Sequence, residues 1–442
     1  MIHKARSKEI LSISLPIIGG MVSQNILNLV DSAMVGSISA TALGAVGLGG
    51  FINFMCVAFF LGFGAGVQAM VSRRIGEERI GEAAHPLNGA LLILLITAIP
   101  ATVLFYYLAP WLMSITNSNP EVAREGVPYL QARFLGILAL GIHFSFRGFW
   151  SAVDMTKVYL HALLIAHSSN VIISYVLIFG KLGLPALGTF GAGLGTTISL
   201  CIAVIYYFIV AGKKARQFGF LEHLPSKTAL KQVIKTSIPA SLQQFLFAAG
   251  FTMMLWIVGK LGIYELAASN IILNLMLVGI LPALGFGIGG ATLVGRSLGR
   301  KDVEGAHLWG WDATKLAVIV VFVLMLPVFL FPDGILKIFL HEQAAIDVAR
   351  LPLRIAAGFL ALETIGVVLF NAINGAGDTK STMIVSFTFQ WLLFLPVAWL
   401  VGPHWGLGLT AIWIAHVSYR VLLTVTMIIL WEKRNWSRIQ LD

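Results

Sequence analysis

One carboxylate stands out because it lies inside an apolar segment long enough to cross a membrane. Asp31 is the only acidic residue of the segment 10–36, which also contains Pro16. A charge at membrane depth costs at least about 2.5–3.5 kcal/mol, so such a group is protonated, paired or placed in a polar cavity. Proline removes one backbone hydrogen bond from a helix and marks a place where it can bend. The segment therefore predicts a carboxyl group in a polar cavity, on a helix that can bend.

Other polar side chains in apolar segments are candidate partners of this acid. Gln24 lies seven residues before Asp31, two helical turns away on the same face. Three more lie in later apolar segments: Asn170, Ser174 and Thr196. Polar residues of this kind also serve as packing contacts between membrane helices. From spacing alone, both interpretations stay open.

A second acid, Glu363, lies in the apolar segment 346–374, and Gln243 and Gln244 lie in another such segment. We treat these three residues as a second candidate site. Structural capping of the acid by a hydroxyl or amide group is the alternative. Six basic side chains in or near the apolar segments are secondary candidates: His143, Arg147, His161, His167, His416 and Arg420.

Composition indicates that lipid, not water, surrounds most of the chain. Of its 442 residues, 58% are hydrophobic and only 11% are charged, whereas soluble domains carry about 25% charged residues. We predict an all-α integral membrane protein of about twelve transmembrane helices, each with roughly 20 or more apolar residues. The predicted spans are 10–36, 44–72, 86–113, 127–151, 158–180, 188–212, 234–260, 264–295, 308–332, 346–374, 380–402 and 406–431.

The net charge of +10 is spread over short loops. Cytoplasmic loops carry an excess of Lys and Arg, which explains this charge without nucleic acid as a partner. The same rule places both termini in the cytoplasm and the chain, expected to be a monomer, in the inner (plasma) membrane. Cys56 and Cys201 lie in apolar runs and predict neither a disulfide nor a metal site.

The two halves of the chain are a repeat. Leu61–Gly66 (Leu-Gly-Phe-Gly-Ala-Gly) returns as Leu284–Gly289 (Leu-Gly-Phe-Gly-Ile-Gly), and Pro16 returns as Pro239, with the same offset of 223 residues. Six spans per half make the repeats parallel, related by a pseudo-two-fold axis along the membrane normal. We predict two six-helix bundles, 1–212 and 234–442, joined by a cytoplasmic linker, 213–233.

The repeat separates shared scaffold from residues present once. Asp31 corresponds to Met254, and Glu363 corresponds to Ala139. Each acid therefore occurs in one half only, which favours a functional role. No Walker lysine, metal-ligand cluster or paired nucleophile and base is apparent. We expect a protein that is not an enzyme and has no cofactor, and any transport must use an ion gradient.

These features together resemble the multidrug and toxic compound extrusion (MATE) family. The resemblance rests on Pro16 and Asp31 in the first helix, the run Asn-Leu-Val-Asp-Ser-Ala-Met-Val-Gly, the Arg-x-x-Gly segments after the second and eighth spans, and Gly-Ala-Gly-Asp-Thr at 375–379. It points to the branch that includes the DNA-damage-inducible F transporters. The resemblance implies antiport, in which drug-like cations or amphiphiles leave the cell as protons or sodium ions enter.

In that branch, the cation site uses an acid on the first helix, an Asn and an Asp on the fifth, and a Thr on the sixth. Asp31, Asn170 and Thr196 match this pattern, but Ser174 stands where the fifth-helix acid is expected. One carboxylate instead of two favours a proton over sodium as the coupling ion. Glu363 matches an acid of the second bundle, whereas its seventh-helix partner position is Phe247.

The resulting hypothesis is a proton switch. Protonation of Asp31 would exchange its hydrogen bonds with Asn170 and Thr196, bend the first helix near Pro16 and close the drug cavity during alternating access. The alternative is a flippase for a lipid-linked oligosaccharide or peptidoglycan precursor, which needs a cationic cavity. The span arginines available for that are Arg133, Arg147, Arg354 and Arg420. A membrane enzyme or receptor is disfavoured, since no catalytic constellation supports it.

Overall fold

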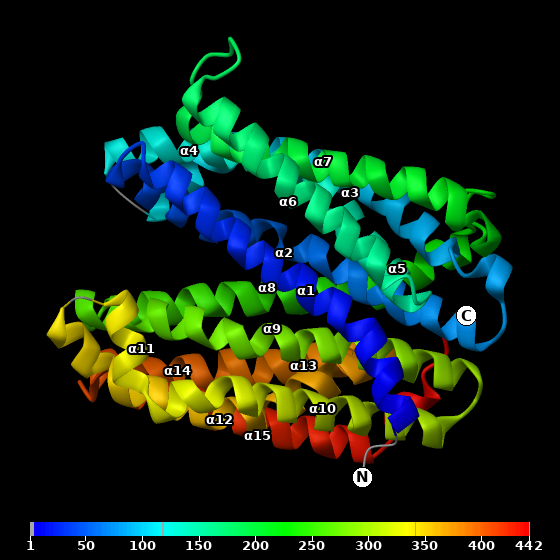
Figure 1. Ribbon diagram of the computed structural model, residues 1–442. Coiled ribbons are helices and arrows are strands. Elements are labelled where there is room, and N and C mark those ends of the chain that lie inside the picture. The colour runs from blue at the N-terminus through cyan, green and yellow to red at the C-terminus, as the bar shows by residue number, and fades with distance from the viewer. Residues whose placement is uncertain (1–3, 117–118, 341, 442) are drawn as a thin grey trace. The chain divides into compact units, whose positions relative to one another are not determined.

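The structure of the chain is a computed structural model that describes residues 4–116, 119–340 and 342–441. Helices dominate it, and none of the residues in these ranges lies in a β-strand (Figure 1). The α-helices are α1 Lys4–Gly36, α2 Ala40–Gly76, α3 His85–Thr116, α4 Pro120–Phe134, α5 Ile137–Ala152, α6 Thr156–Phe179, α7 Gly188–Lys214, α8 Lys227–Gly259, α9 Ile263–Gly299, α10 Val303–Leu330, α11 Pro332–Phe339, α12 Gln343–Gly375, α13 Thr379–Phe387, α14 Leu395–Trp399 and α15 Gly408–Glu432.

The predicted twelve spans are confirmed by length and composition. Eleven helical segments of the described chain are long and apolar enough to cross a membrane, and the pair α4 and α5 makes the twelfth, bent by 50°. The bend falls where the chain leaves α4 at Phe134 and re-enters a helix at Ile137, through Gly136. A broken span of this kind leaves backbone groups of α4 and α5 available to neighbouring helices.

By its internal contacts the chain divides into two compact units. One, which we call the N unit, comprises Gly19–Phe245; the other, the C unit, comprises the chain up to Ile18 and Leu246–Leu441. The division differs from the predicted boundary in the linker 213–233. The division cuts two helices: α1 after Ile18 and α8 after Phe245. The first part of α1 therefore belongs to the C unit, and the first part of α8 belongs to the N unit.

The glycine repeat explains these exchanges. In the C unit, Gly289 of α9 lies against Ser14 of α1, at a place where a Cβ atom would clash. In the N unit, Gly66 of α2 lies in the same way against Ser237 of α8. Ser14 and Ser237 are fully buried. The absence of a side chain at these glycines lets two helices approach closely, as is common in membranes.

The same relation recurs one turn earlier along α2 and α9. Gly62 lies against the backbone of Ser241, and Gly285 lies against the side chain of Ile18. We call the two glycine pairs, Gly62 with Gly66 and Gly285 with Gly289, the glycine seats. They receive the initial segments of α8 and α1, respectively, and so convert a sequence repeat into a repeated helix contact.

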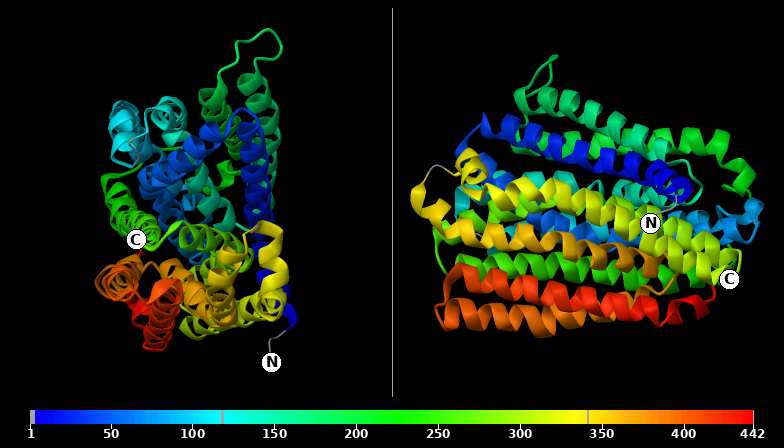
Figure 2. Two further views of the ribbon diagram at one scale, coloured as in Figure 1. Left: turned by 90° about the vertical axis from the view of Figure 1, so that its left-hand side faces the viewer. Right: turned by 60° about the horizontal axis from the view of Figure 1, so that its bottom comes forward.

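Within the C unit, α12 packs against α9, α10 and α15, as Figures 1 and 2 show from three directions. The eleventh predicted span contains two π-helical segments, η3 Thr388–Phe394 and η4 Leu400–His404. From η3, the Gln390 amide and the Trp391 indole N–H donate to the carbonyl oxygens of Phe247 and Leu246, at 3.3 and 3.1 Å. The wider helical turn thus presents both side chains to α8.

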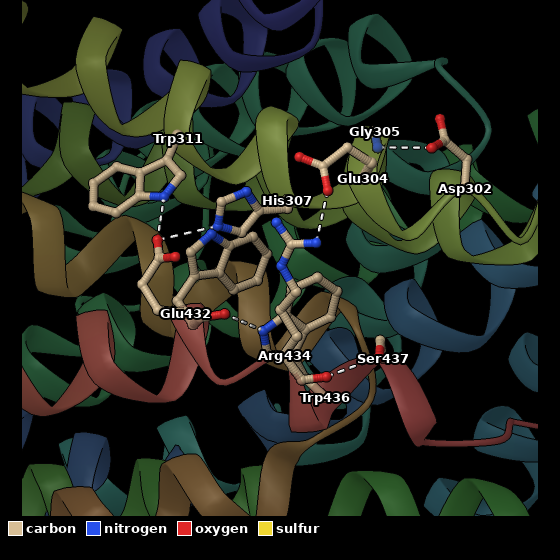
Figure 3. Close-up of polar contacts among 10 residues, drawn as sticks. Asp302, Glu304, Gly305, His307, Trp311, Glu432, Arg434, Trp436 and Ser437 are labelled. Carbon is tan, nitrogen blue, oxygen red and sulfur yellow. Dashed lines mark hydrogen bonds and ion pairs between the residues drawn. The ribbon is translucent and has the colours of Figure 1, made fainter.

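The chain that follows each bundle folds back onto its third helix. In the C unit, the Trp311 indole N–H of α10 donates to Glu432, the last residue of α15, at 2.8 Å, and Arg434 beyond α15 donates to Glu304 of α10 at 2.6 Å (Figure 3). Trp431 stacks on Trp436. In the N unit, Asn88 of α3 donates to the carbonyl oxygen of Gly219 at 2.9 Å. Asn88 and Trp311 are separated by the repeat offset of 223 residues. The two halves therefore share this docking arrangement although its side chains differ.

Candidate functional site

The candidate site lies in the N unit, where α1 runs beside α6 and α6 runs beside α7 (Figure 1). His167 of α6 holds α1 through both ring nitrogens, at 2.8 Å from the Ser23 hydroxyl and 3.1 Å from the Gln24 carboxamide oxygen. The Gln24 amide also donates to Asn28 at 3.1 Å. Gln24 therefore belongs to a contact between α1 and α6, and no bond joins it to Asp31 in the described part of the chain.

Asp31, Asn170 and Thr196 come together as a hydrogen-bonded chain across three helices. Asn170 is fully buried between the other two. When its carboxamide nitrogen faces α1, it donates to Asp31 Oδ1 at 2.9 Å, and its oxygen accepts from the Thr196 hydroxyl and backbone N–H at 3.1 and 3.3 Å. Amide orientation is assigned from such bonds, and an ionised carboxylate, which only accepts, requires this one.

Ser174 forms a packing contact between α6 and α7, unlike Asn170, which forms hydrogen bonds. Its side chain is buried and packs directly against Gly195 of α7, where a Cβ atom would clash with the hydroxyl. The hydroxyl oxygen has no hydrogen-bond partner in the structure. Ser174 therefore brings α6 and α7 close together and adds no charge beside Asn170.

Three residues that sequence reasoning did not assign to this site also lie here. Arg133 and Tyr129 of α4 are close enough to Asp31 to interact with it electrostatically. Arg133, Thr196 and the buried Asn53 of α2 line one small cavity. Arg133 was considered only as part of a cationic cavity. The available signal was an arginine three residues before Gly136, within the predicted fourth span.

Glu363, the second candidate, has a direct partner. It is buried on α12, and Oε2 accepts a hydrogen bond from Arg420 Nε of α15 at 3.0 Å. The sequence alone could not identify Arg420 as the partner of Glu363. Gln243 and Gln244 lie on the part of α8 that belongs to the N unit. Glu363 lies in the C unit, and the grouping of these three residues in a second site stays a prediction.

Pro16 lies within a helix that continues on both sides of it, from Lys4 to Gly36. Two residues later, after Ile18, α1 passes from the C unit to the N unit. Proline removes the backbone hydrogen bond at this position. The predicted bending at Pro16 therefore falls beside the place where α1 changes units.

The four span arginines are divided between the two units. Arg133 and Arg147 lie in the N unit, and Arg354 and Arg420 lie in the C unit. Arg147 lies over the Phe144 ring at 4.6 Å, and Arg354 lies over the Phe329 ring at 5.2 Å. Among the residues described, no group of three or more His, Cys, Asp or Glu side chains could hold a metal ion.

The twelve apolar spans place the chain in the class of multi-pass integral membrane proteins, and a hydrogen-bonded carboxyl group lies buried among the spans of the N unit. The family model MatE matches residues 16–176 and 239–400, that is, both halves of the repeat. The chain belongs to this family, whose members are transporters and not enzymes, and the predicted membership is thereby confirmed.

Curated relatives are similar over nearly their whole length. The probable multidrug resistance protein NorM of Pasteurella multocida is 27% identical, over 96% of this chain and 94% of the relative. The multidrug resistance protein MdtK of Yersinia pseudotuberculosis is 23% identical, over 98% and 96%. The assignment to the DNA-damage-inducible F branch stays a prediction.

Solved structures share the fold. A multidrug resistance MATE family transporter of the MOP superfamily, in its outward-facing conformation, superposes with a TM-score of 0.90 at 20% identity, covering 98% of this chain and 97% of that one. A MOP superfamily transporter from Pyrococcus furiosus, described as having a binding pocket of reversed polarity, gives 0.88 at 20% identity, covering 97% and 96%. The predicted architecture of two helical bundles is confirmed by this likeness.

Proposed function

We propose that this protein is a proton-coupled multidrug efflux antiporter, which exports organic cations or amphiphilic toxic compounds by alternating access. The names of the relatives support the substrate class, since NorM and MdtK are both described as multidrug resistance proteins. The expected setting is the inner membrane, with both termini in the cytoplasm. The observation that carries the proposal is the chain of hydrogen bonds from Asp31 through Asn170 to Thr196.

This chain of bonds has two complete states. With Asp31 ionised, the Asn170 amide N–H donates to Asp31, and the Asn170 oxygen accepts from Thr196. With Asp31 protonated, its O–H donates to the Asn170 oxygen, and the rotated Asn170 amide donates to the Thr196 hydroxyl at 3.1 Å. The Thr196 hydroxyl then donates to the carbonyl oxygen of Ala192 at 3.0 Å.

In both states Asp31, Asn170 and Thr196 each keep a hydrogen-bond partner, which matters because an unpaired buried polar group costs about 1–3 kcal/mol. A proton can therefore enter and leave Asp31 by rotation of one amide group. Rotation of the Asn170 amide reverses the direction of the hydrogen bond between α6 and Asp31 of α1. Since α1 begins in the C unit, a shift of this helix involves both units.

The first test is Asp31→Asn, which removes the titratable group and keeps the side-chain size. The purified protein is reconstituted into proteoliposomes, and transport of a fluorescent cationic dye is driven by an imposed pH gradient. We expect the wild type to respond and Asp31→Asn to fall to the level of empty vesicles, because the carboxyl group that takes up the proton is gone.

Glu9→Gln is the matched control, since Glu9 is an exposed acid on the same helix. It should transport dye like the wild type. Size-exclusion profiles and thermal unfolding establish that each variant is folded. Proton-driven dye transport that survives in folded Asp31→Asn contradicts the proposal.

A further inference from the structure

Arg133 occupies a fixed position between α4 and α7. Gly193 of α7 has no room for a Cβ atom against the carbonyl oxygen of Tyr129 and the side chain of Ala132. The Thr197 hydroxyl donates to the Ala132 carbonyl oxygen at 2.8 Å. These contacts hold the last turn of α4 against the turn of α7 that carries Thr196. Arg133 is thereby placed beside the hydrogen-bonded chain of Asp31, Asn170 and Thr196.

The small cavity at this place is lined in part by buried polar atoms that have no hydrogen-bond partner. Asn53 is 5% exposed, and its carboxamide oxygen has no hydrogen-bond partner in the structure. The Arg133 Nε is also buried without a partner. Both side chains line the cavity together with Thr196, and Val57, Leu140 and Leu200 form much of the remaining lining. A polar cavity with unpaired groups of both kinds suits bound water.

Arg133 acts on Asp31 through space. The two charges interact electrostatically, yet in the described chain they form no direct ion pair. Two further residues near Asp31 are uncharged: Tyr129 on α4 and Asn170 on α6. Ser174, one turn after Asn170, contributes no charge.

The charges therefore cancel when Asp31 is ionised and leave one positive charge when Asp31 is protonated. Sodium binding would place a second full cation beside a guanidinium, and it would require several oxygen ligands. Instead, Asn170 directs an N–H group at the carboxylate. A proton needs no coordination shell, because it forms one covalent O–H bond with the carboxyl oxygen.

We propose that Arg133 determines the ion specificity of this site, so that Asp31 takes up a proton and rejects sodium. The inference rests on the proposed function, in which Asp31 is the coupling group. It also gives the protonated site a net positive charge that opposes a bound organic cation. Arg133 is thus a positioning charge, acting on the coupling site without itself carrying the proton.

The test replaces the charge and asks which ion drives transport. Wild type, Arg133→Gln, Arg133→Lys and Arg124→Gln are reconstituted, and cationic dye movement is measured under a pH gradient alone and a sodium gradient alone. Arg124 is an exposed arginine on the same helix, so its replacement controls for loss of charge on α4. Wild type, Arg133→Lys and Arg124→Gln should respond to the pH gradient only.

Arg133→Gln should respond to the sodium gradient, with sodium-driven transport about tenfold above wild type, since removal of one nearby like charge favours the cation by that order. An Arg133→Gln protein that folds and stays insensitive to sodium overturns the proposal. Binding of radioactive sodium to the wild type gives a second readout that needs no Arg133 variant. Saturable binding that Asp31→Asn abolishes also overturns it.

The Asp31→Asn variant separates two hypotheses: that Asp31 is the coupling group, and that Arg133 determines which ion it takes up. If Asp31→Asn transports dye, the proposed function fails, whatever Arg133 does. If Asp31→Asn is inactive and Arg133→Gln remains coupled to protons alone, the coupling site stands and only the role of Arg133 fails.

Discussion

At the scale of single residues, the two membrane acids have different surroundings. Asp31 is bonded to the neutral Asn170, whereas Glu363 is paired directly with Arg420. A neutral partner can accept or donate according to the protonation of the acid. A guanidinium has only donors, so it stabilises the ionised acid alone. We therefore propose proton exchange at Asp31 and a structural role for Glu363.

This contrast predicts the stability of Glu363 variants. Glu363→Gln should lower the stability of the folded protein by about 3–5 kcal/mol, because it leaves Arg420 as a buried charge without its counterion. The measurement is thermal or chemical unfolding of the purified protein in detergent. The double variant Glu363→Gln with Arg420→Met should recover most of this loss. A single variant as stable as the wild type would assign the ion pair no structural role.

At the scale of helices, the glycine seats hold the initial segments of α1 and α8. Two pairs of glycines at the repeat offset receive two helix segments in the same way, in separate units. At Gly62 the neighbour is the backbone of Ser241. A backbone cannot rotate away as a side chain can, so an added methyl group must separate the helices.

We therefore predict that Gly62→Ala destabilises the protein by about 1–3 kcal/mol through overpacking. Gly50→Ala is the control on the same helix, since a Cβ atom at Gly50 meets nothing within 4 Å. It should be neutral or stabilising, because Ala favours helix by about 1 kcal/mol over Gly. Thermal unfolding of both variants decides the matter, and equal midpoints would argue against a tight contact at Gly62.

At the scale of the whole molecule, α1 is the helix through which the candidate site could influence both units. It carries Asp31 in the N unit, and its first turns lie in the C unit. Pro16 lies just before the change of unit. The loss of one backbone hydrogen bond there makes this point of α1 easier to bend.

If bending at this point belongs to the transport cycle, Pro16→Ala should slow dye transport several-fold. Its stability should not fall, since Ala is about 3 kcal/mol more favourable than Pro inside a helix. Initial transport rates in proteoliposomes, together with unfolding midpoints, test both parts. The reverse result, full transport with a stiffer helix, would remove bending at Pro16 from the mechanism.

The sequence predicted the spans well, because a bilayer requires about twenty apolar residues for each crossing. The equivalence of the halves followed from one constant offset. The grouping of Asp31, Asn170 and Thr196 came from a family resemblance, and their hydrogen bonds could not be derived from spacing. The roles of Arg133 and Arg420 were missed, because a charge on one helix does not identify which helix will face it. The sequence also did not predict that the first parts of α1 and α8 belong to opposite units, because it does not identify the helices that they contact.

The packing of the first segments of α1 and α8 in opposite units also sets the order in which contacts can form during synthesis of the chain. Chains fold progressively from the N-terminus, yet the N unit includes residues up to Phe245. The first segment of α1 meets its seat, Gly285 and Gly289, only after more than half of the chain has emerged from the ribosome. Until α9 has been synthesised, the first segment of α1 lacks its contact with Gly285 and Gly289. Completion of each half therefore depends on synthesis of the other.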